Sequence, residues 1–243
     1  MNIPETFPCV IPARYESCRF PGKPLKMIDG KSMISRVYDN AMASKLAEPV
    51  VVATDDERIY DHCKEEGMNV VYTSSECENG SVRVAEVAET MNEPYFFELQ
   101  GDQPLVNSAV IDEFLAKARK EVVEDSRIDI VQPYAPVTPE MIQDKDVVKV
   151  VVSKSGKFLT FTRHPLETGY RTLGLYLWKR EPLLKFNHME ISELEKAETC
   201  HLVRFVLNDL VVQGIEIDDT NWIEADRPEH IAQIEKIIKE KKV

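Results

Sequence analysis

Short apolar runs alternate with amphipathic segments through the first half of the chain. We expect four buried strands, because these runs are brief, rich in Val, Tyr and Phe, and bounded by polar residues, Gly or Pro. They are PCVIPA (8–13), PVVVATDD (49–56), MNVVYTS (68–74) and the start of YFFELQGDQPLV (95–106). Apolar residues with helical spacing follow in MISRVYDNAMAS (33–44), ERIYDHCKEEG (57–67), SVRVAEVAETM (81–91) and VIDEFLAKARKEVVE (110–124). This alternation favours right-handed βαβ units, and so predicts a doubly wound α/β fold with a mainly parallel sheet.

The pattern is more mixed after Ile128. Strand-like runs lie at DIVQPYAPV (129–137), VKVVVSKSGKFLTFTR (148–163) and LGLYLWKR (173–180), and SKSG within the second predicts a hairpin turn. A helical stretch over 192–214, a short strand over 215–221 and a basic helix over 230–242 follow. Because no linker, repeat or low-complexity tract divides the chain, we expect residues 1–243 to form one domain.

Composition and charge limit the classes of partner. The 243 residues are 43% hydrophobic and 30% charged, with a formal net charge of −12, so no basic footprint for nucleic acid is present. No apolar run is long enough to span a bilayer, and the start of the chain does not resemble a secretory signal. The five cysteines are odd in number and include no C-x-x-C pair, which favours reduced thiols over a disulfide framework or zinc site. We expect a cytoplasmic protein without membrane insertion.

The loop after the first strand carries three cations. IPARYESCRFPGKPL places Arg14, Arg19 and Lys23 beside a strand end, with Gly22 between two prolines. Spaced cations and exposed backbone N–H groups suit a triphosphate, whose leaving pyrophosphate they stabilise. The alternative is a solvated basic turn. The loop is not a Walker A motif, because G-x-x-x-x-G-K-[ST] is absent.

Two acidic positions follow predicted strands. Asp102 in LQGDQPL comes directly after a buried strand and a glycine, where a carboxylate is a natural ligand for Mg²⁺ in a phosphate cleft. An ordinary turn or capping aspartate is the alternative. The pair Asp55–Asp56 also follows a strand, but its spacing favours the cap of the next helix.

The motifs together resemble the CMP-Kdo synthetase family, the 3-deoxy-manno-octulosonate cytidylyltransferases. They are, in the order of that family, IPARYESCRFPGKPL, VVVATDDERI, LQGDQPLV, VKVVV…LTFTR, LGLYLW and EADRPEHI. The resemblance implies a magnesium-dependent homodimer that transfers CMP from CTP to the hydroxyl of an eight-carbon sugar acid, for lipopolysaccharide or polysaccharide biosynthesis. It also implies that residues 1–127 mainly bind CTP and that 128–220 form a smaller subdomain for acceptor binding or dimerisation. Residues 221–243 would return to the site and carry a carboxylate that binds the metal.

Individual roles are carried over from this resemblance. It implies that Asp226 joins Asp102 as a metal ligand, although D-x-P-E is also a good helix cap. It implies catalytic roles for Arg14, Lys23 and Asp102. Nucleotide contacts are expected from Pro12, Ala13, Arg14, Arg19, Lys23, Gly80, Ser81, Arg83 and Gln100, and acceptor contacts from Gln100, Arg163 and Arg204. Packing is the alternative role for both acceptor arginines.

The acceptor half departs from the family pattern. His201 and Leu202 replace a Glu and a Gln, Thr172 and Leu173 precede the LGLYLW strand in place of a His, and the segment from Arg163 to Gly174 is short. Because apolar replacements leave hydroxyl groups of a sugar unpaired, we predict either a Kdo-like acceptor or another small anionic acceptor such as a phosphonate. A catalytically inactive nucleotide-binding protein is a third hypothesis, which the intact cations and carboxylates disfavour.

Overall fold

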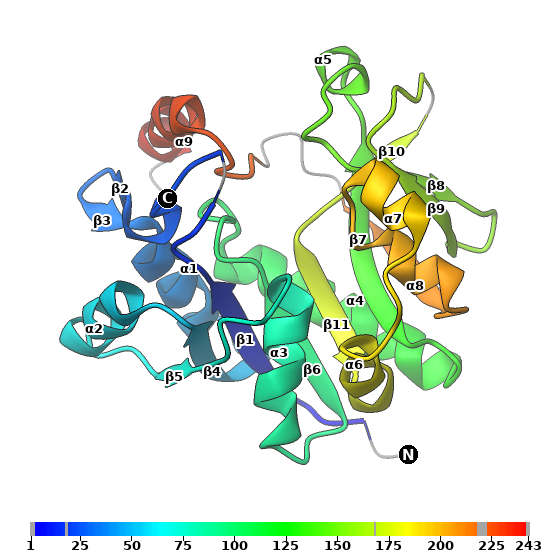
Figure 1. Ribbon diagram of the computed structural model, residues 1–243, viewed down its shortest axis with the longest axis horizontal. Coiled ribbons are helices and arrows are strands. Elements are labelled where there is room, and N and C mark those ends of the chain that lie inside the picture. The colour runs from blue at the N-terminus through cyan, green and yellow to red at the C-terminus, as the bar shows by residue number, and fades with distance from the viewer. Residues whose placement is uncertain (1–2, 18, 168, 218–222, 242–243) are drawn as a thin grey trace.

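The first half of the computed structural model follows the predicted alternation of strands and helices (Figure 1). The structure describes residues 3–17, 19–167, 169–217 and 223–241. The four expected strands are β1 (Phe7–Ala13), β4 (Ala47–Thr54), β5 (Val70–Tyr72) and β6 (Tyr95–Leu99). The four expected helices are α1 (Met33–Met42), α2 (Glu57–Glu65), α3 (Gly80–Glu89) and α4 (Ser108–Glu124).

One ten-stranded sheet runs through both halves of the chain. Its second half contains β7 (Ile130–Pro136), β8 (Lys149–Val152), β9 (Phe158–Thr162), β10 (Tyr170–Thr172), β11 (Leu175–Lys179) and β12 (Val212–Glu216). The order is β5-β4-β1-β6-β11-β7-β10-β8-β9, with β12 paired to β7. Only β9, β10 and β11 run against the direction of the others, which confirms the mainly parallel α/β sheet.

Alternating strand residues supply the two cores of the sheet. In β1, Phe7, Cys9 and Ile11 face the core under α1, α2 and α4, whereas Val10 faces the opposite core. That second core packs under α3 and α6 (Arg180–Phe186), which lie on the near face of the sheet in Figure 1. Burial on both faces explains why these strands read as continuous apolar runs.

The predicted long helix over 192–214 is wrong. The segment forms α7 (Glu193–Glu198) and α8 (Val203–Leu207), and its last residues belong to β12. The backbone turns left-handed at Thr199 (φ 49°) and Asp209 (φ 58°), and each turn ends a helix. The apolar run that follows pairs parallel to β7 instead. The pattern also missed β10, α6 and the one-turn helix α5 (Pro139–Ile142), whereas the SKSG turn is confirmed by Gly156 (φ 80°).

The last helix returns the chain to the first loop. α9 (Pro228–Lys241) packs on the hairpin of β2 (Met27–Ile28) and β3 (Lys31–Ser32), where Ile28, Met33 and Ile234 share a small core. The segment before α9 lies beside the loop that follows β6, where the Ala225 N–H donates to the carbonyl of Asp102 (2.9 Å). This packing brings residues from both ends of the chain to one edge of the sheet.

The cysteines that the structure describes are all buried. Cys9, Cys63, Cys77 and Cys200 are buried and free, and Cys18 lies outside the described residues. Within the described part of the chain, no helix has the length and apolar character needed to cross a membrane.

Candidate functional site

A cavity of about 550 Å³ lies where β1 and β6 end. It is lined from both halves of the chain, as expected for a ligand site at the carboxyl ends of parallel strands. The predicted site residues on its wall are Pro12, Ala13, Arg14, Arg19, Lys23, Gly80, Arg83, Gln100, Asp102, Arg163 and Asp226. Two predicted residues, Ser81 and Arg204, do not line it.

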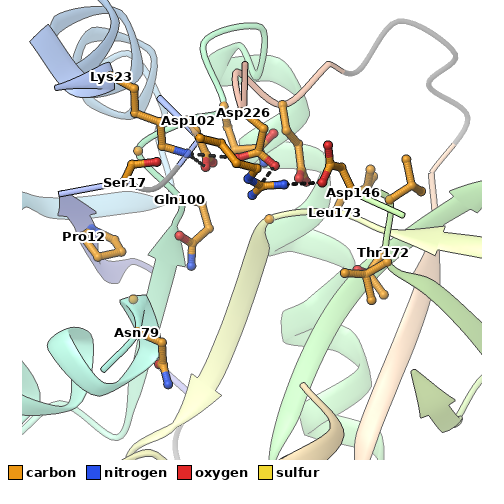
Figure 2. Close-up of a pocket in the computed structure, with 18 of the residues that line it drawn as sticks. Pro12, Ser17, Lys23, Asn79, Gln100, Asp102, Asp146, Thr172, Leu173 and Asp226 are labelled. Carbon is orange, nitrogen blue, oxygen red and sulfur yellow. Dashed lines mark hydrogen bonds and ion pairs between the residues drawn. The ribbon is translucent and has the colours of Figure 1, made fainter. Parts of the chain in front are cut away.

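The ammonium group of Lys23 lies between the two predicted metal carboxylates. Its Nζ is 2.5 Å from Asp102 Oδ2 and 3.1 Å from Asp226 Oδ1 (Figure 2). Lys23 begins the one-turn helix η1 (Lys23–Leu25), behind Gly22, whose φ of 68° favours glycine. Burial alone would lower the pKa of Lys23, but the two carboxylates together raise it. Lys23 is therefore a charged ammonium at neutral pH.

The two carboxylates fit a hard cation. Because one ammonium contacts both, their oxygens already converge on a single point, which is the position a divalent ion would need. No group of three or more His, Cys, Asp or Glu side chains in the described part of the chain is arranged to hold a metal. Mg²⁺ binds well through one or two protein carboxylates when phosphates and water complete its shell. The donors present therefore suit a magnesium ion that arrives with a nucleotide.

Glu224 adds a third acidic group beside this pair. Burial, followed by the charges of Asp102 and Asp226, raises the pKa of Glu224 to about 7. Glu224 also lines the cavity. Burial contributes most to this shift, and the two aspartate charges add to it.

An ionic link that the sequence analysis missed crosses the mouth of the cavity. Asp146 accepts from Arg19 Nη1 (2.6 Å) and from Arg227 Nε (2.6 Å), and Arg19 Nη2 also lies 3.0 Å from Asp226. Burial would raise the pKa of Asp146, but the hydrogen bonds from the two arginines lower it. The segment DKDVVK offered only a run of charge, so nothing in the sequence marked Asp146 as a partner of the first loop.

Arg14 differs from the other cations of the first loop. It is exposed at the cavity wall, and no described residue hydrogen-bonds to or pairs with its guanidinium. A free guanidinium is available to bind a phosphate group without first breaking an internal contact. Arg14 therefore has the most accessible charge among the predicted phosphate ligands.

The start of α3 forms another wall. Asn79 caps the helix by accepting from Val82 N–H (3.0 Å), and Gly80 faces the side chain of Gln100. Arg83 is almost fully buried, with its guanidinium on Asp55 Oδ1 (3.1 Å) and on Thr73 Oγ1 (2.5 Å). Only part of Arg83 therefore reaches the cavity.

The Asp55–Asp56 pair plays the structural role that its spacing predicted. Asp56 caps α2 by accepting from Arg58 N–H (3.0 Å), and Asp55 holds Arg83.

Ser81 donates to a buried acid instead of facing the cavity. Its hydroxyl lies 3.1 Å from Oε1 of Glu98, which also accepts from Gln100 Nε2 (2.5 Å). Trp178 Nε1 donates to the other carboxylate oxygen (2.8 Å). Glu98 is 0% exposed, and burial raises its pKa to about 7 against the opposing effect of these three donors. A single Glu inside an apolar strand was the only sequence signal for this network.

The two arginines predicted to bind the acceptor are held by the protein. Arg163 donates to the carbonyls of Lys145 (3.0 Å) and Asp146 (2.7 Å), although it still lines the cavity. Arg204 is 2% exposed and makes two hydrogen bonds to Glu195 (2.6 and 2.8 Å). Arg204 therefore lies inside the protein against Glu195 and does not line the cavity.

His201 lies on the acceptor side of the cavity. Its Nε2 is buried and has no hydrogen-bond partner among the described residues. Burial, followed by the charges of Arg204, Arg163 and Arg14, lowers the pKa of His201 to about 3. The imidazole is therefore neutral at physiological pH, and its Nε2 atom is buried within the protein.

Comparison with known proteins identifies relatives of this chain. Residues 8–242 match the protein-family model described as Cytidylyltransferase. The chain is 36% identical over 239 residues to the 3-deoxy-manno-octulosonate cytidylyltransferase of Chlamydia pneumoniae, covering 94% of this chain and 92% of that protein. It is 34% identical over 242 residues to the protein of the same name from Chlorobium phaeobacteroides, covering 95% and 96%.

The structure also has a solved neighbour with a bound nucleotide. CMP:2-keto-3-deoxy-manno-octonic acid synthetase in complex with CTP superposes with a TM-score of 0.87 at 26% identity, over 97% of this chain and 99% of that chain.

Proposed function

Since the chain belongs to the cytidylyltransferase family and is a CTP-dependent nucleotidyltransferase, we propose that it transfers CMP from CTP to a Kdo-like 3-deoxy sugar acid and releases pyrophosphate. The observation that carries this proposal is the convergence of Asp102 and Asp226 on Lys23, in a cavity that also holds Arg14 and Arg19. Cations for a triphosphate and carboxylates for a hard metal ion thus occupy one site.

The cations of the first loop would hold the polyphosphate. The acceptor hydroxyl attacks the α-phosphorus in line and gives up its proton to solvent, and the bond to the bridging oxygen of the β-phosphate breaks as pyrophosphate leaves. Arg14, Arg19 and Lys23 offset the charge that grows on the leaving group. Lys23 and Arg19 release their carboxylate partners in part as they turn to the phosphates.

Magnesium belongs to this proposal as the cofactor. Asp102 and Asp226 would hold the ion, which when bound supplies a positive charge that polarises the phosphate oxygens. The two aspartates meet because α9 packs on the β2–β3 hairpin and returns residues 223–226 to the end of β6.

A smaller acceptor such as a phosphonate is the second candidate. Much of the acceptor side is apolar, since Val147, Val148, Leu173 and Leu202 line it. Such a wall leaves sugar hydroxyls without partners, at about 1–3 kcal/mol each. The neutral His201 also lines the cavity, but its Nε2 atom is buried and so adds no partner for a sugar hydroxyl, which is consistent with an acceptor that has few hydroxyls.

A homodimer in the cytoplasm is also part of the proposal. The exposed side chains of Leu159 on β9, Leu194 on α7 and Leu207 on α8 support an interface on the second half of the chain. Light scattering after size exclusion tests it, with a monomer at micromolar concentration as the contrary result.

The decisive test is pyrophosphate release from CTP across a panel of 2-keto sugar acids and small phosphonates, with and without Mg²⁺. Turnover that needs Mg²⁺ and a 3-deoxy sugar acid is the expected result. Turnover only with phosphonates selects the second candidate, and equal rates with ATP and CTP contradict both.

A further inference from the structure

We propose that the buried carboxylate of Glu98 fixes the side-chain amide of Gln100 so that its carbonyl oxygen faces the cavity and accepts a hydrogen bond from the bound substrate. Gln100 would then select a substrate group that donates. Glu98 acts through Gln100 and touches no ligand, so it is a positioning residue. The proposal rests on the proposed function only for the identity of the acceptor.

The carboxylate of Glu98 is surrounded by groups that donate to it. Trp178 Nε1 is a donor only, and it occupies Oε2 at 2.8 Å. Ser81 Oγ and Gln100 Nε2 share Oε1, at 3.1 and 2.5 Å. An ionised carboxylate accepts and never donates, so the amide of Gln100 must turn its NH₂ group toward Glu98.

The opposite end of the amide is open. No described residue donates to Gln100 Oε1, and Gln100 lies on the cavity wall beside Pro12 (Figure 2). A cytosine amino group or an acceptor hydroxyl would supply the missing donor, whereas the O4 atom of uracil would meet another acceptor.

The glycines around Gln100 leave the space that its side chain occupies. A Cβ atom added to Gly80 would lie 2.8 Å from Gln100 Nε2, and one added to Gly174 would lie 3.1 Å from Gln100 Cβ and Cγ. The Gln100 backbone N–H also donates to the carbonyl of Gly174 (3.0 Å). The backbone bond does not orient the terminal amide of Gln100, so the carboxylate of Glu98 decides which end of the amide faces outward.

Protonation of Glu98 would remove its control over the orientation of the Gln100 amide. A carboxylic acid with its proton on Oε1 donates to the oxygen of Gln100, which would turn the NH₂ group to the cavity. The pKa of Glu98 is about 7, so both forms are populated near neutrality. The groups facing Glu98 are the neutral donors above and Tyr176, the register partner of Glu98 on β11. Burial, followed by the charge of Glu98, raises the pKa of Tyr176 well above its usual range, so this phenol stays protonated.

The first test measures binding without turnover. Calorimetry gives the Kd of CTP and UTP at pH 6 and pH 8.5 for the wild type, Glu98→Gln and Glu98→Met, with melting temperatures as the folding control. If cytosine is the donor, the wild type prefers CTP most strongly at pH 8.5. Glu98→Gln should reduce that preference about tenfold, and Glu98→Met should reduce it further, because the Met thioether is only a weak acceptor. A purely structural role would instead weaken both nucleotides together, in proportion to the loss of stability.

The second test covers the acceptor as the donor. In that case nucleotide binding stays unchanged, and Glu98→Gln raises the KM of the acceptor about tenfold with kcat within about twofold. The fluorescence of Trp178 provides an independent measurement, made in a Trp222→Phe background so that Trp178 is the only tryptophan. Its emission should change with pH near 7 as Glu98 ionises, and this change should be absent in Glu98→Gln. A CTP preference and an acceptor KM that are both insensitive to pH and to the two variants would overturn the proposal. The Trp178 transition requires neither substrate, so it still reports on Glu98 if the proposed acceptor is wrong.

Discussion

Lys23 Nζ lies 2.5 Å from Asp102 Oδ2, although 79 positions separate the two residues, and the same ammonium reaches Asp226 across 203 positions. One positive charge therefore holds together carboxylates from the middle and the end of the chain. It occupies the point where a divalent ion would bind the same oxygens.

Replacing Lys23 should make folding depend on a divalent cation. Lys23→Met removes the ammonium and leaves Asp102 and Asp226 in repulsion, at a cost of about 2–3 kcal/mol of unfolding free energy in EDTA. Added Mg²⁺ should restore much of this loss, because it replaces the missing charge. Thermal melts with and without Mg²⁺ measure the effect, and Lys31→Met, on the exposed β3, is the matched control. A variant that melts identically in EDTA and Mg²⁺ would show that the carboxylates do not form a cation site.

The carboxylates should matter more to turnover than to folding. Asp102→Asn conserves shape but removes charge at a proposed metal ligand, so kcat should fall at least about 100-fold while the fold is kept. Asp226→Asn should behave similarly. Pyrophosphate release at varied Mg²⁺, with circular dichroism as the folding check, measures this. Turnover close to wild type would reassign Asp102 as a structural residue.

The link at the cavity mouth should compete with CTP. Asp146 holds Arg19 and Arg227, and the side chains of both arginines are at least 40% exposed. Partly exposed ion pairs contribute about 0.2–1 kcal/mol. Asp146→Asn frees Arg19 for phosphate, so the KM for CTP should fall about two- to threefold, with a smaller effect in high salt. Initial rates at low and high ionic strength measure it, and a higher KM in the variant would mean that Asp146 positions Arg19 for the nucleotide.

The parallel half of the fold was predictable because burial on both faces leaves a clear sequence pattern. The site residues were only partly predictable from the sequence. Arg14, Lys23 and Asp102 follow predicted strands and could be found, whereas Asp146 contacts Arg19 across 127 positions with no local signal. The interpretation of 192–214 as one helix failed because apolar spacing does not reveal a left-handed turn such as that at Thr199.

Stability should fall with pH through the range where Glu98 ionises. The pKa of Glu98 is about 7 in the folded protein and near 4.5 when unfolded, so the folded state binds more protons between these values. Unfolding free energy attributable to Glu98 therefore decreases as pH rises from about 4.5 to about 7, by about 3 kcal/mol in all. Urea unfolding of wild type and Glu98→Gln across this range isolates the effect by difference. Parallel curves of unfolding free energy against pH for the two proteins would contradict this prediction. Glu86→Gln, which replaces an acid on α3 outside this network, is the control and should keep the wild-type dependence of unfolding free energy on pH.

Acceptor choice should follow the apolar wall of the cavity. Leu202 is 3% exposed and lines the cavity at a position where the family resemblance implies a Gln. Leu202→Gln restores a partner for a sugar hydroxyl, so kcat/KM for Kdo should rise about tenfold relative to a small phosphonate, with the KM for CTP unchanged. Val123→Gln, an exposed apolar residue on α4 outside the cavity lining, is the control and should leave that ratio as in the wild type. Rates with saturating CTP measure both. A wild type that already prefers Kdo by orders of magnitude, with no gain from Leu202→Gln, would show that this wall does not disfavour the sugar acid.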